Sequence, residues 1–219
     1  MEMLAPETYS LNYLRLGLKG SGKGKSRKPQ VLSIISMLLE NSVKKNEKCM
    51  TSIADKDPVT VFHGSRAPAL SIQQYVDRIF KYACCSPSCF VVAHIYMEKF
   101  IQCTSSFLTS INVHRLLITS VMVAAKFIDD AFFNNAYYAR VGGVSTAEMN
   151  ILEMKFLFGL DFRLQVSVQT FENYCTLLEN EGKSMTMTLQ IERSLQAYCG
   201  IKESCWSNKE DSTSAQIAR

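Results

Sequence analysis

The stretch LLITSVMVAAKFIDD, residues 116–130, is almost wholly apolar until Lys126. A helix that has no polar face is buried on all sides in a water-soluble protein. The sequence therefore predicts a central helix over residues 112–129, with the other helices packed around it. Lys126 is the exception in this helix, because an unpaired cation is costly to bury. Its side chain must reach solvent, pair internally or face a partner.

Other segments carry the start signals of helices, such as Ser71 with Gln74 and Ser145 with Glu148, which fit capping boxes. Asn112 is expected to cap the central helix, and Ser167 marks the start of the last one. Five helices are thus predicted, over residues 71–85, 86–102, 112–129, 145–159 and 167–181. Period-2 alternation of useful length is absent from the sequence, so the predicted fold class is all-α.

The ends of the chain differ from this central part. Residues 1–29 are expected to be a flexible basic tail, since KGSGKGKSRK (19–28) is rich in glycine, serine and lysine. Residues 30–46 have apolar positions at helical spacing and predict an amphipathic helix. A linker with Pro58, Gly64 and Pro68 follows over residues 47–70. Residues 184–203 are compatible with one further C-terminal helix, and the end from Trp206 on looks loose.

Composition excludes several classes of protein. The 219 residues carry a mild net charge of +4, with the basic residues scattered apart from one cluster, which does not favour nucleic-acid binding. No apolar stretch approaches the roughly 20 residues of a membrane span. The first residues, MEMLAPETYS, lack the pattern of a signal peptide. The eight cysteines are accordingly expected to be reduced thiols.

Catalytic and metal-binding patterns are not evident. None of the three histidines lies beside a nucleophile or a carboxylate pair in the sequence. Cys85, Cys89 and His94 lack the further ligand that a zinc site needs. The segment 19–28 has the wrong spacing for a phosphate-binding loop and follows no buried strand, so it is interpreted as a solvated basic tail with a weak nuclear-targeting signal. No catalytic residue, metal or cofactor is expected, and the chain is not predicted to be an enzyme.

The simplest interpretation of Lys126 is an interaction with the helix dipole and with Asp129 or Asp130. A second charge favours another interpretation. Glu153 lies in NILEMKFLFGLDF (150–162), where apolar residues fill most of the predicted helix. Two such charges on consecutive packed helices can form a polar pair at the rim of an exposed apolar groove, which is a docking site for a helix of another protein.

These segments resemble the cyclin box. AAKFIDD (124–130), EMKFLFGLDF (153–162) and HIYMEKF (94–100) are similar to its signature segments, although the family usually has Asp-Arg where this chain has Glu98-Lys99. Residues 71–100 and 112–150 are similar to plant P-type cyclins, also called U-type, almost throughout. The resemblance covers residues 58–181, which are the expected box. It leaves the tail over 1–29, the N-terminal helix and linker over 30–57, and a C-terminal extension over 182–219.

The resemblance implies a five-helix box around a central third helix, in agreement with the prediction made from hydrophobic pattern alone. It implies a regulatory subunit without catalytic activity, which binds an A-type cyclin-dependent kinase as a heterodimer and activates it. The role would be in cell division or phosphate signalling, in the nucleus or cytoplasm. Lys126 and Glu153 would contact the kinase, and Arg78 and Glu98 would form an internal ion pair. Further apolar contacts are expected from Phe127, Ile128, Leu117, Phe156 and Phe171.

Some features depart from the wider family. The first box helix has YVDRIFKY in place of the MRxILxDWL of mitotic cyclins, so substrate docking through that patch is not expected. The chain has room for only one box. Arg15–Leu18 matches an RxxL degradation pattern, which is common by chance. The alternative function is a cyclin-fold adaptor for a non-kinase partner, but a nucleic-acid partner would need a basic face, and residues 71–181 carry mixed charge.

Overall fold

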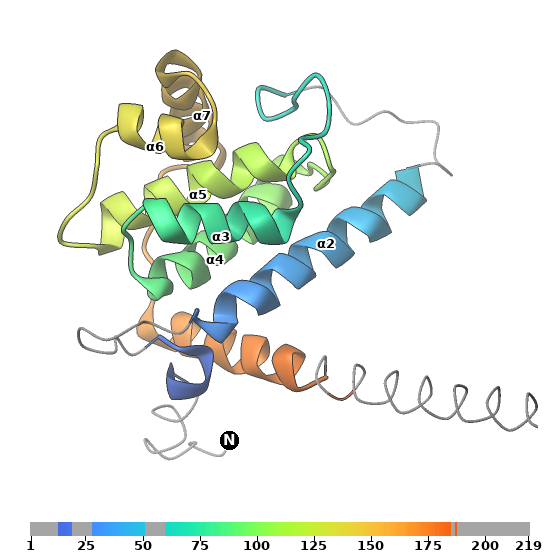
Figure 1. The fold of residues 1–219 in the computed structure, drawn as a ribbon, viewed down its shortest axis with the longest axis vertical. Coiled ribbons are helices and arrows are strands. Elements are labelled where there is room, and N and C mark those ends of the chain that lie inside the picture. The colour runs from blue at the N-terminus through green and yellow to red at the C-terminus, as the bar shows by residue number, and fades with distance from the viewer. Residues whose placement is uncertain (1–12, 19–27, 51–59, 185–186, 188–219) are drawn as a thin grey trace, which may run out of the picture. The chain divides into compact units, whose positions relative to one another are not determined.

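The computed structural model describes residues 13–18, 28–50, 60–184 and 187. The chain divides into two units, Met1–Glu179 and Asn180–Arg219. In the first unit the labelled helices (Figure 1) are α2 (Gln30–Met50), α3 (Ile72–Tyr82), α4 (Pro87–Thr104), α5 (Val113–Ile128), α6 (Asn135–Gly142) and α7 (Thr146–Gly159). A helical turn covers residues 13–16, and another helix starts at residue 168 and covers the rest of this unit. In the second unit, residues 180–184 are helical. The described residues contain no strand, so the predicted all-α class is confirmed.

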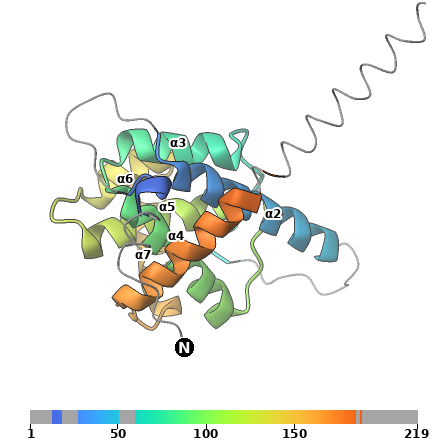
Figure 2. The same cartoon turned by 90° about the horizontal axis from the view of Figure 1, so that it is seen from below.

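Helix α5 is the central helix, as its apolar sequence predicted. Twelve of its sixteen residues are buried, and it packs against α3, α4, α6 and α7. In Figures 1 and 2 it runs through the middle of these helices. Its two buried hydroxyl groups are satisfied within the helix, since Thr119 donates to the carbonyl of Arg115 and Ser120 donates to that of Leu117. Helix α5 is therefore held firmly in place, and it fixes the position of the residues that follow its last turn.

Helix α2 belongs to the core rather than to a separate N-terminal region. It packs against α3 and α4 and buries Val31, Leu32, Ile34, Ile35, Leu39 and Val43. Part of the expected tail also packs, because Leu16 in the turn over residues 13–16 is buried. The expectation of a non-packing tail over 1–29 is therefore wrong for this turn. The basic segment over 19–27 lies outside the described residues, as do residues 188–203 of the proposed last helix.

Local capping explains where most helices begin. Ser71 and Gln74 form the predicted capping box, and the Ser145 hydroxyl accepts from the backbone of Glu148. The Ser167 hydroxyl likewise accepts from the backbone of Thr170. Asn112 precedes α5 as predicted but makes no side-chain cap. Its amide group accepts from the Thr109 backbone and donates to the Phe107 carbonyl instead.

Helix α6 was missed by the sequence interpretation. Its eight residues are too few for a clear hydrophobic period. The capping residues were the usable signal. The Asn134 side chain accepts from the backbone of Tyr137, and Gly143 ends the helix with a φ of +74°, a conformation that favours glycine. Helix α6 packs on α5 and α7 and so brings its first residues close to both.

A buried aromatic cluster holds α7 on α4. The rings of Phe100 and Phe156 are stacked with centroids 4.9 Å apart, and Phe62 meets Phe100 edge-on at 5.1 Å. Phe62 comes from the segment that the sequence marked as linker, so this part of the segment is anchored in the core. The cluster fixes how far α7 is shifted along α5. It therefore also sets the position of Glu153 on α7 relative to Lys126 on α5.

Candidate functional site

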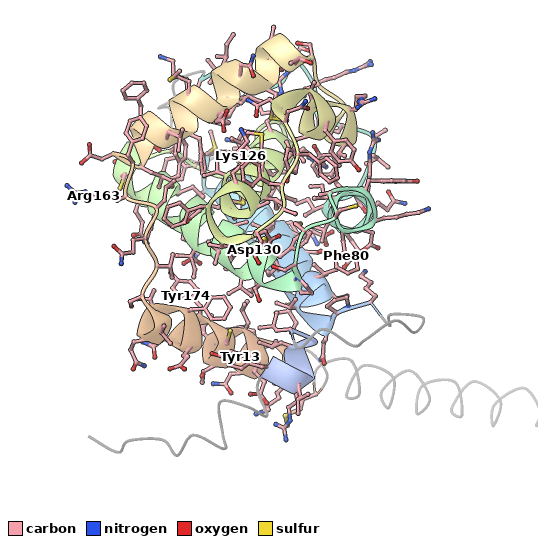
Figure 3. All side chains as sticks on the ribbon, turned by 90° about the vertical axis from the view of Figure 1, so that its left-hand side faces the viewer. Tyr13, Phe80, Lys126, Asp130, Arg163 and Tyr174 are labelled. Carbon is pink, nitrogen blue, oxygen red and sulfur yellow. The ribbon has the colours of Figure 1, made fainter. Side chains whose placement is uncertain are left out.

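Lys126 points from the last turn of α5 toward α7 (Figure 3). Its Nζ lies 2.7 Å from Glu153 Oε1 and also donates to the Asn135 side-chain oxygen. The Asn135 amide donates in turn to Glu153 Oε2 at 2.6 Å and to Asn150 Oδ1 at 2.7 Å. A polar network thus joins the end of α5, the start of α6 and the middle of α7.

The network lies at the edge of the molecule. The side chains of Lys126 and Glu153 keep 26% and 20% of their exposure, so the ion pair is neither in the deep core nor free in solvent. Pairs with this much solvent contact contribute about 0–1 kcal/mol to stability. Their exposed faces remain able to contact a partner molecule.

The interpretation in which Lys126 pairs with Asp129 or Asp130 is wrong for Asp129. That carboxylate accepts from the Ser86 backbone at 2.9 Å, from the Ser86 hydroxyl at 2.8 Å and from the Cys89 thiol at 3.1 Å. These bonds connect the end of α5 to the first turn of α4, where a negative charge also suits the helix dipole. Lys126 instead pairs with Glu153 and donates to Asn135.

Apolar residues that directly follow Lys126 and Glu153 in the sequence are exposed. Phe127 and Ile128, which follow Lys126, are 52% and 40% exposed, and Met154, which follows Glu153, is also exposed. Together with Lys126 and Glu153, these three residues are called the docking surface below. Other apolar residues near it along the chain are exposed too, although the hydrophobic pattern did not predict this: Phe132, Phe133, Ile151, Phe158 and Phe162. Their aromatic enrichment beside a charged pair was the available signal.

Three of the predicted apolar contacts lie elsewhere or inside. Leu117 and Phe156 lie on the inner faces of α5 and α7 and are buried in the core. They cannot contact a docked partner, so the prediction of a kinase contact is wrong for both. Phe171 is half-buried in the helix that starts at residue 168, with its ring 6.1 Å from that of Tyr13. Only Phe127 and Ile128 of the predicted apolar set adjoin the charged pair.

The predicted ion pair between Arg78 and Glu98 is not formed, and this prediction is wrong. Helix α3 contacts α4 through the rings of Phe80 and Phe90, but Arg78 lies toward α6 and donates to the Arg140 carbonyl there at 3.2 Å. Glu98 instead accepts from the Tyr174 hydroxyl at 2.7 Å and lies 3.3 Å from His94 Nε2. These two contacts, His94 first, hold the pKa of Glu98 below its ordinary value despite partial burial.

Other site chemistry is limited. In the parts of the chain that the structure describes, no three His, Cys, Asp or Glu side chains gather as metal ligands would. The six cysteines in these parts are free thiols. A search of the same residues for a helix long and apolar enough to cross a bilayer finds none.

A model of the cyclin family matches residues 30–164. The chain belongs to the cyclin family. It is 56% identical to Cyclin-P3-1 of Oryza sativa subsp. japonica over 192 residues, which are 87% of this chain and 80% of the relative. It is 52% identical to Cyclin-U3-1 of Arabidopsis thaliana over 198 residues, 90% of this chain and 86% of the relative. The predicted membership of the plant P-type and U-type cyclins is confirmed.

The family match starts at α2, ahead of residue 58, where the resemblance placed the beginning of the box. This agrees with the burial of α2 in the core. Cyclins are regulatory subunits rather than enzymes, and binding to cyclin-dependent kinases is a general property of the family. For a cyclin, an open surface that combines charge and apolar side chains is a candidate for that contact.

Proposed function

We propose that this cyclin binds an A-type cyclin-dependent kinase and favours its active conformation. The observation that supports this most directly is the docking surface. There the Lys126–Glu153 pair is partly exposed, and the residues that follow these two in the sequence, Phe127, Ile128 and Met154, are exposed as well. Exposed apolar residues around fixed charges are typical of surfaces that receive a helix of a partner protein.

The charged pair and the apolar residues of the docking surface contribute unequally to the preference for the active kinase. Reversing a kinase population from 1:99 to 99:1 needs a preference of about 5.5 kcal/mol for the active form. An exposed ion pair supplies about 0–1 kcal/mol. At about 25 cal/mol per Å², the remainder corresponds to about 200 Å² of apolar surface that is buried only against the active form. The apolar side chains therefore supply most of the preference, while Lys126 and Glu153 set the orientation.

Exchanging the charges of Lys126 and Glu153 tests the docking surface. In Lys126→Glu/Glu153→Lys the two side chains can still pair with each other, so the fold should be kept while the charges presented to the kinase are reversed. We expect at least tenfold weaker binding to a purified A-type kinase, measured by calorimetry, and a matching loss of kinase activation on a peptide substrate. Phe127→Ser should weaken binding through the apolar part of the same surface.

The control is a second ion pair at the surface of the same domain, Lys28 with Asp77. Lys28→Asp/Asp77→Lys also exchanges charges without changing the net charge, and should bind the kinase like the wild type. Unchanged binding in Lys126→Glu/Glu153→Lys would show that the docking surface is wrongly placed. Failure of the wild-type chain to form a complex with any cyclin-dependent kinase would favour the alternative, an adaptor for a non-kinase partner.

The similarity to plant P-type and U-type cyclins supports a role in cell division or phosphate signalling. We propose that this activity lies in the nucleus, in the cytoplasm or in both. Imaging of the tagged full chain, together with a kinase pull-down from plant tissue, tests both the compartment and the kinase class.

A further inference from the structure

Three cysteines lie where α3 ends and α4 begins. Cys84 and Cys85 are in the connecting loop, and Cys89 is in the first turn of α4. Cys84 is exposed, Cys85 is half-buried, and Cys89 is buried completely. All three are free thiols, and none of them belongs to the docking surface. The loop thus places a thiol that solvent can reach close in sequence to one that it cannot.

A single carboxylate oxygen holds Cys89 next to the backbone that follows Cys85. The Ser86 N–H donates to Asp129 Oδ2 at 2.9 Å, and the Cys89 thiol donates to the same oxygen at 3.1 Å. The Cys89 N–H also donates to the Ser86 carbonyl at 3.0 Å, which closes the first turn of α4. Across this turn the Cys85 and Cys89 side chains share a hydrogen bond. The two sulfur atoms are therefore neighbours in the reduced protein, as the formation of a disulfide requires.

The two thiols differ in how readily they react. The hydrogen bond with Cys85 and, after it, burial raise the pKa of Cys89, so Cys89 stays a protonated thiol. Its burial also shields it from solutes. Cys85 is partly exposed, so a small oxidant can reach its sulfur. An accessible cysteine beside a second cysteine that can resolve it is typical of a peroxide-sensitive pair.

We propose that Cys85 and Cys89 form a peroxide-sensitive pair, which hydrogen peroxide converts to a disulfide. The Cys85 sulfur attacks one peroxide oxygen, the O–O bond breaks, and the products are Cys85 sulfenic acid and water. The Cys89 sulfur then attacks the Cys85 sulfur and displaces the hydroxyl group, which leaves as water with the Cys89 thiol proton. Asp129 Oδ2 accepts from that thiol and is placed to pass the proton on. Two thiols and one hydrogen peroxide thus give one disulfide and two waters.

Closing the disulfide also changes how α4 is connected to α5. Asp129 accepts from the Ser86 N–H, the Ser86 hydroxyl and the Cys89 thiol. A disulfide sulfur carries no proton, so the bond from Cys89 is lost. Asp129 directly follows Ile128, the last residue of α5. Oxidation should therefore loosen the end of α5, and this effect does not depend on whether a kinase binds there.

The test treats the full chain with hydrogen peroxide at near-neutral pH. Free thiols are then alkylated in denaturant, disulfides are reduced, and the newly released thiols are labelled with a second reagent. Trypsin yields residues 82–99 as one peptide that holds all three cysteines of this region. We expect fragmentation of this peptide to place the second label on Cys85 and Cys89. Treatment with dithiothreitol after the peroxide and before alkylation should abolish that label.

Cys85→Ser should reduce the second label on Cys89 at least tenfold. Cys84→Ser is the matched control, since it removes the adjacent and more exposed thiol and should form the disulfide like the wild type. Amide hydrogen exchange over residues 126–130 should become faster on oxidation of the wild type and of Cys84→Ser, but not of Cys85→Ser. A second label on Cys84 in place of Cys85, or no disulfide in the wild type, would overturn the proposed pair. Unchanged exchange in the oxidised wild type would overturn its link to the end of α5.

Discussion

Glu98 lies in the second half of α4, where it receives the hydroxyl of Tyr174 at 2.7 Å and lies 3.3 Å from His94 Nε2. Tyr174 comes from the helix that starts at residue 168, so the carboxylate connects that helix to the centre of the domain. Both contacts favour the ionised form of Glu98, and its pKa is lowered as a result. Glu98, which was predicted to pair with Arg78, therefore connects α4 to the helix that starts at residue 168.

The lowered pKa predicts a pH dependence of stability. The contribution of Glu98 to the free energy of unfolding is fully present above the ordinary glutamate pKa of about 4.3, and is lost as the pH falls through the lower folded-state value. Glu98→Gln should therefore cost more at pH 7 than at pH 3, as measured by urea denaturation. In a Tyr174→Phe background this difference should shrink. An equal cost at both pH values would contradict the assignment.

Sequence alone identified Lys126 and Glu153, because a charge within a nearly apolar helix is conspicuous. It could not identify Asn135, which joins them, since an asparagine after Phe132 and Phe133 in an expected loop follows no pattern. Nor could it separate exposed from buried apolar residues on α5 and α7. Both helices are apolar nearly all round, so their pattern alone does not say which side faces solvent.

At the scale of whole helices, the contact between α7 and α4 depends on the absence of one side chain. A Cβ on Gly159, the last residue of α7, would come within 2.3 Å of the Phe100 ring. That ring is stacked on Phe156 and meets Phe62 edge-on, so it cannot move aside freely. The glycine lets the end of α7 approach α4 closely.

Gly159→Ala should therefore lower the free energy of unfolding by about 1–3 kcal/mol, the usual cost of overpacking a core. The measurement is urea denaturation followed by circular dichroism. Phe100→Leu is destabilising by itself, but the two changes together should cost less than the sum of the single costs, because leucine makes room for the new methyl group. Additive costs would show that the ring is not the obstacle.

Capping signals predicted the helix starts at Ser71, Ser145 and Ser167, because these hydroxyls accept from the first backbone N–H groups locally. Asn112 marked the start of α5 without capping it. Such signals could not predict how the helices pack. The expected Arg78–Glu98 pair required Arg78 to face α4, whereas it lies toward α6 and donates to the Arg140 carbonyl. The shapes of the apolar faces decide which helices pack together and in what orientation. A single sequence does not reveal these shapes.

Across the whole molecule, the first and last parts of the Met1–Glu179 unit meet. Figure 3 shows Tyr13 beside the helix that carries Tyr174, and the Tyr13 ring lies 6.1 Å from that of Phe171. Arg15 pairs with Glu179, and Leu16 between these contacts is buried. The RxxL pattern at Arg15–Leu18 is therefore part of a folded turn, which a recognition protein would have to open.

Leu16→Ala tests how firmly this turn is held. Loss of a leucine that is 1% exposed should lower the free energy of unfolding by about 2–5 kcal/mol, since transfer and cavity costs add. Leu14→Ala is the matched control. Its side chain is 56% exposed, and surface changes usually stay within about 0.5 kcal/mol. Trypsin should also cleave after Arg15 faster in Leu16→Ala than in Leu14→Ala. Equal stability and equal cleavage in the two variants would mean that the turn packs too weakly to shield the pattern.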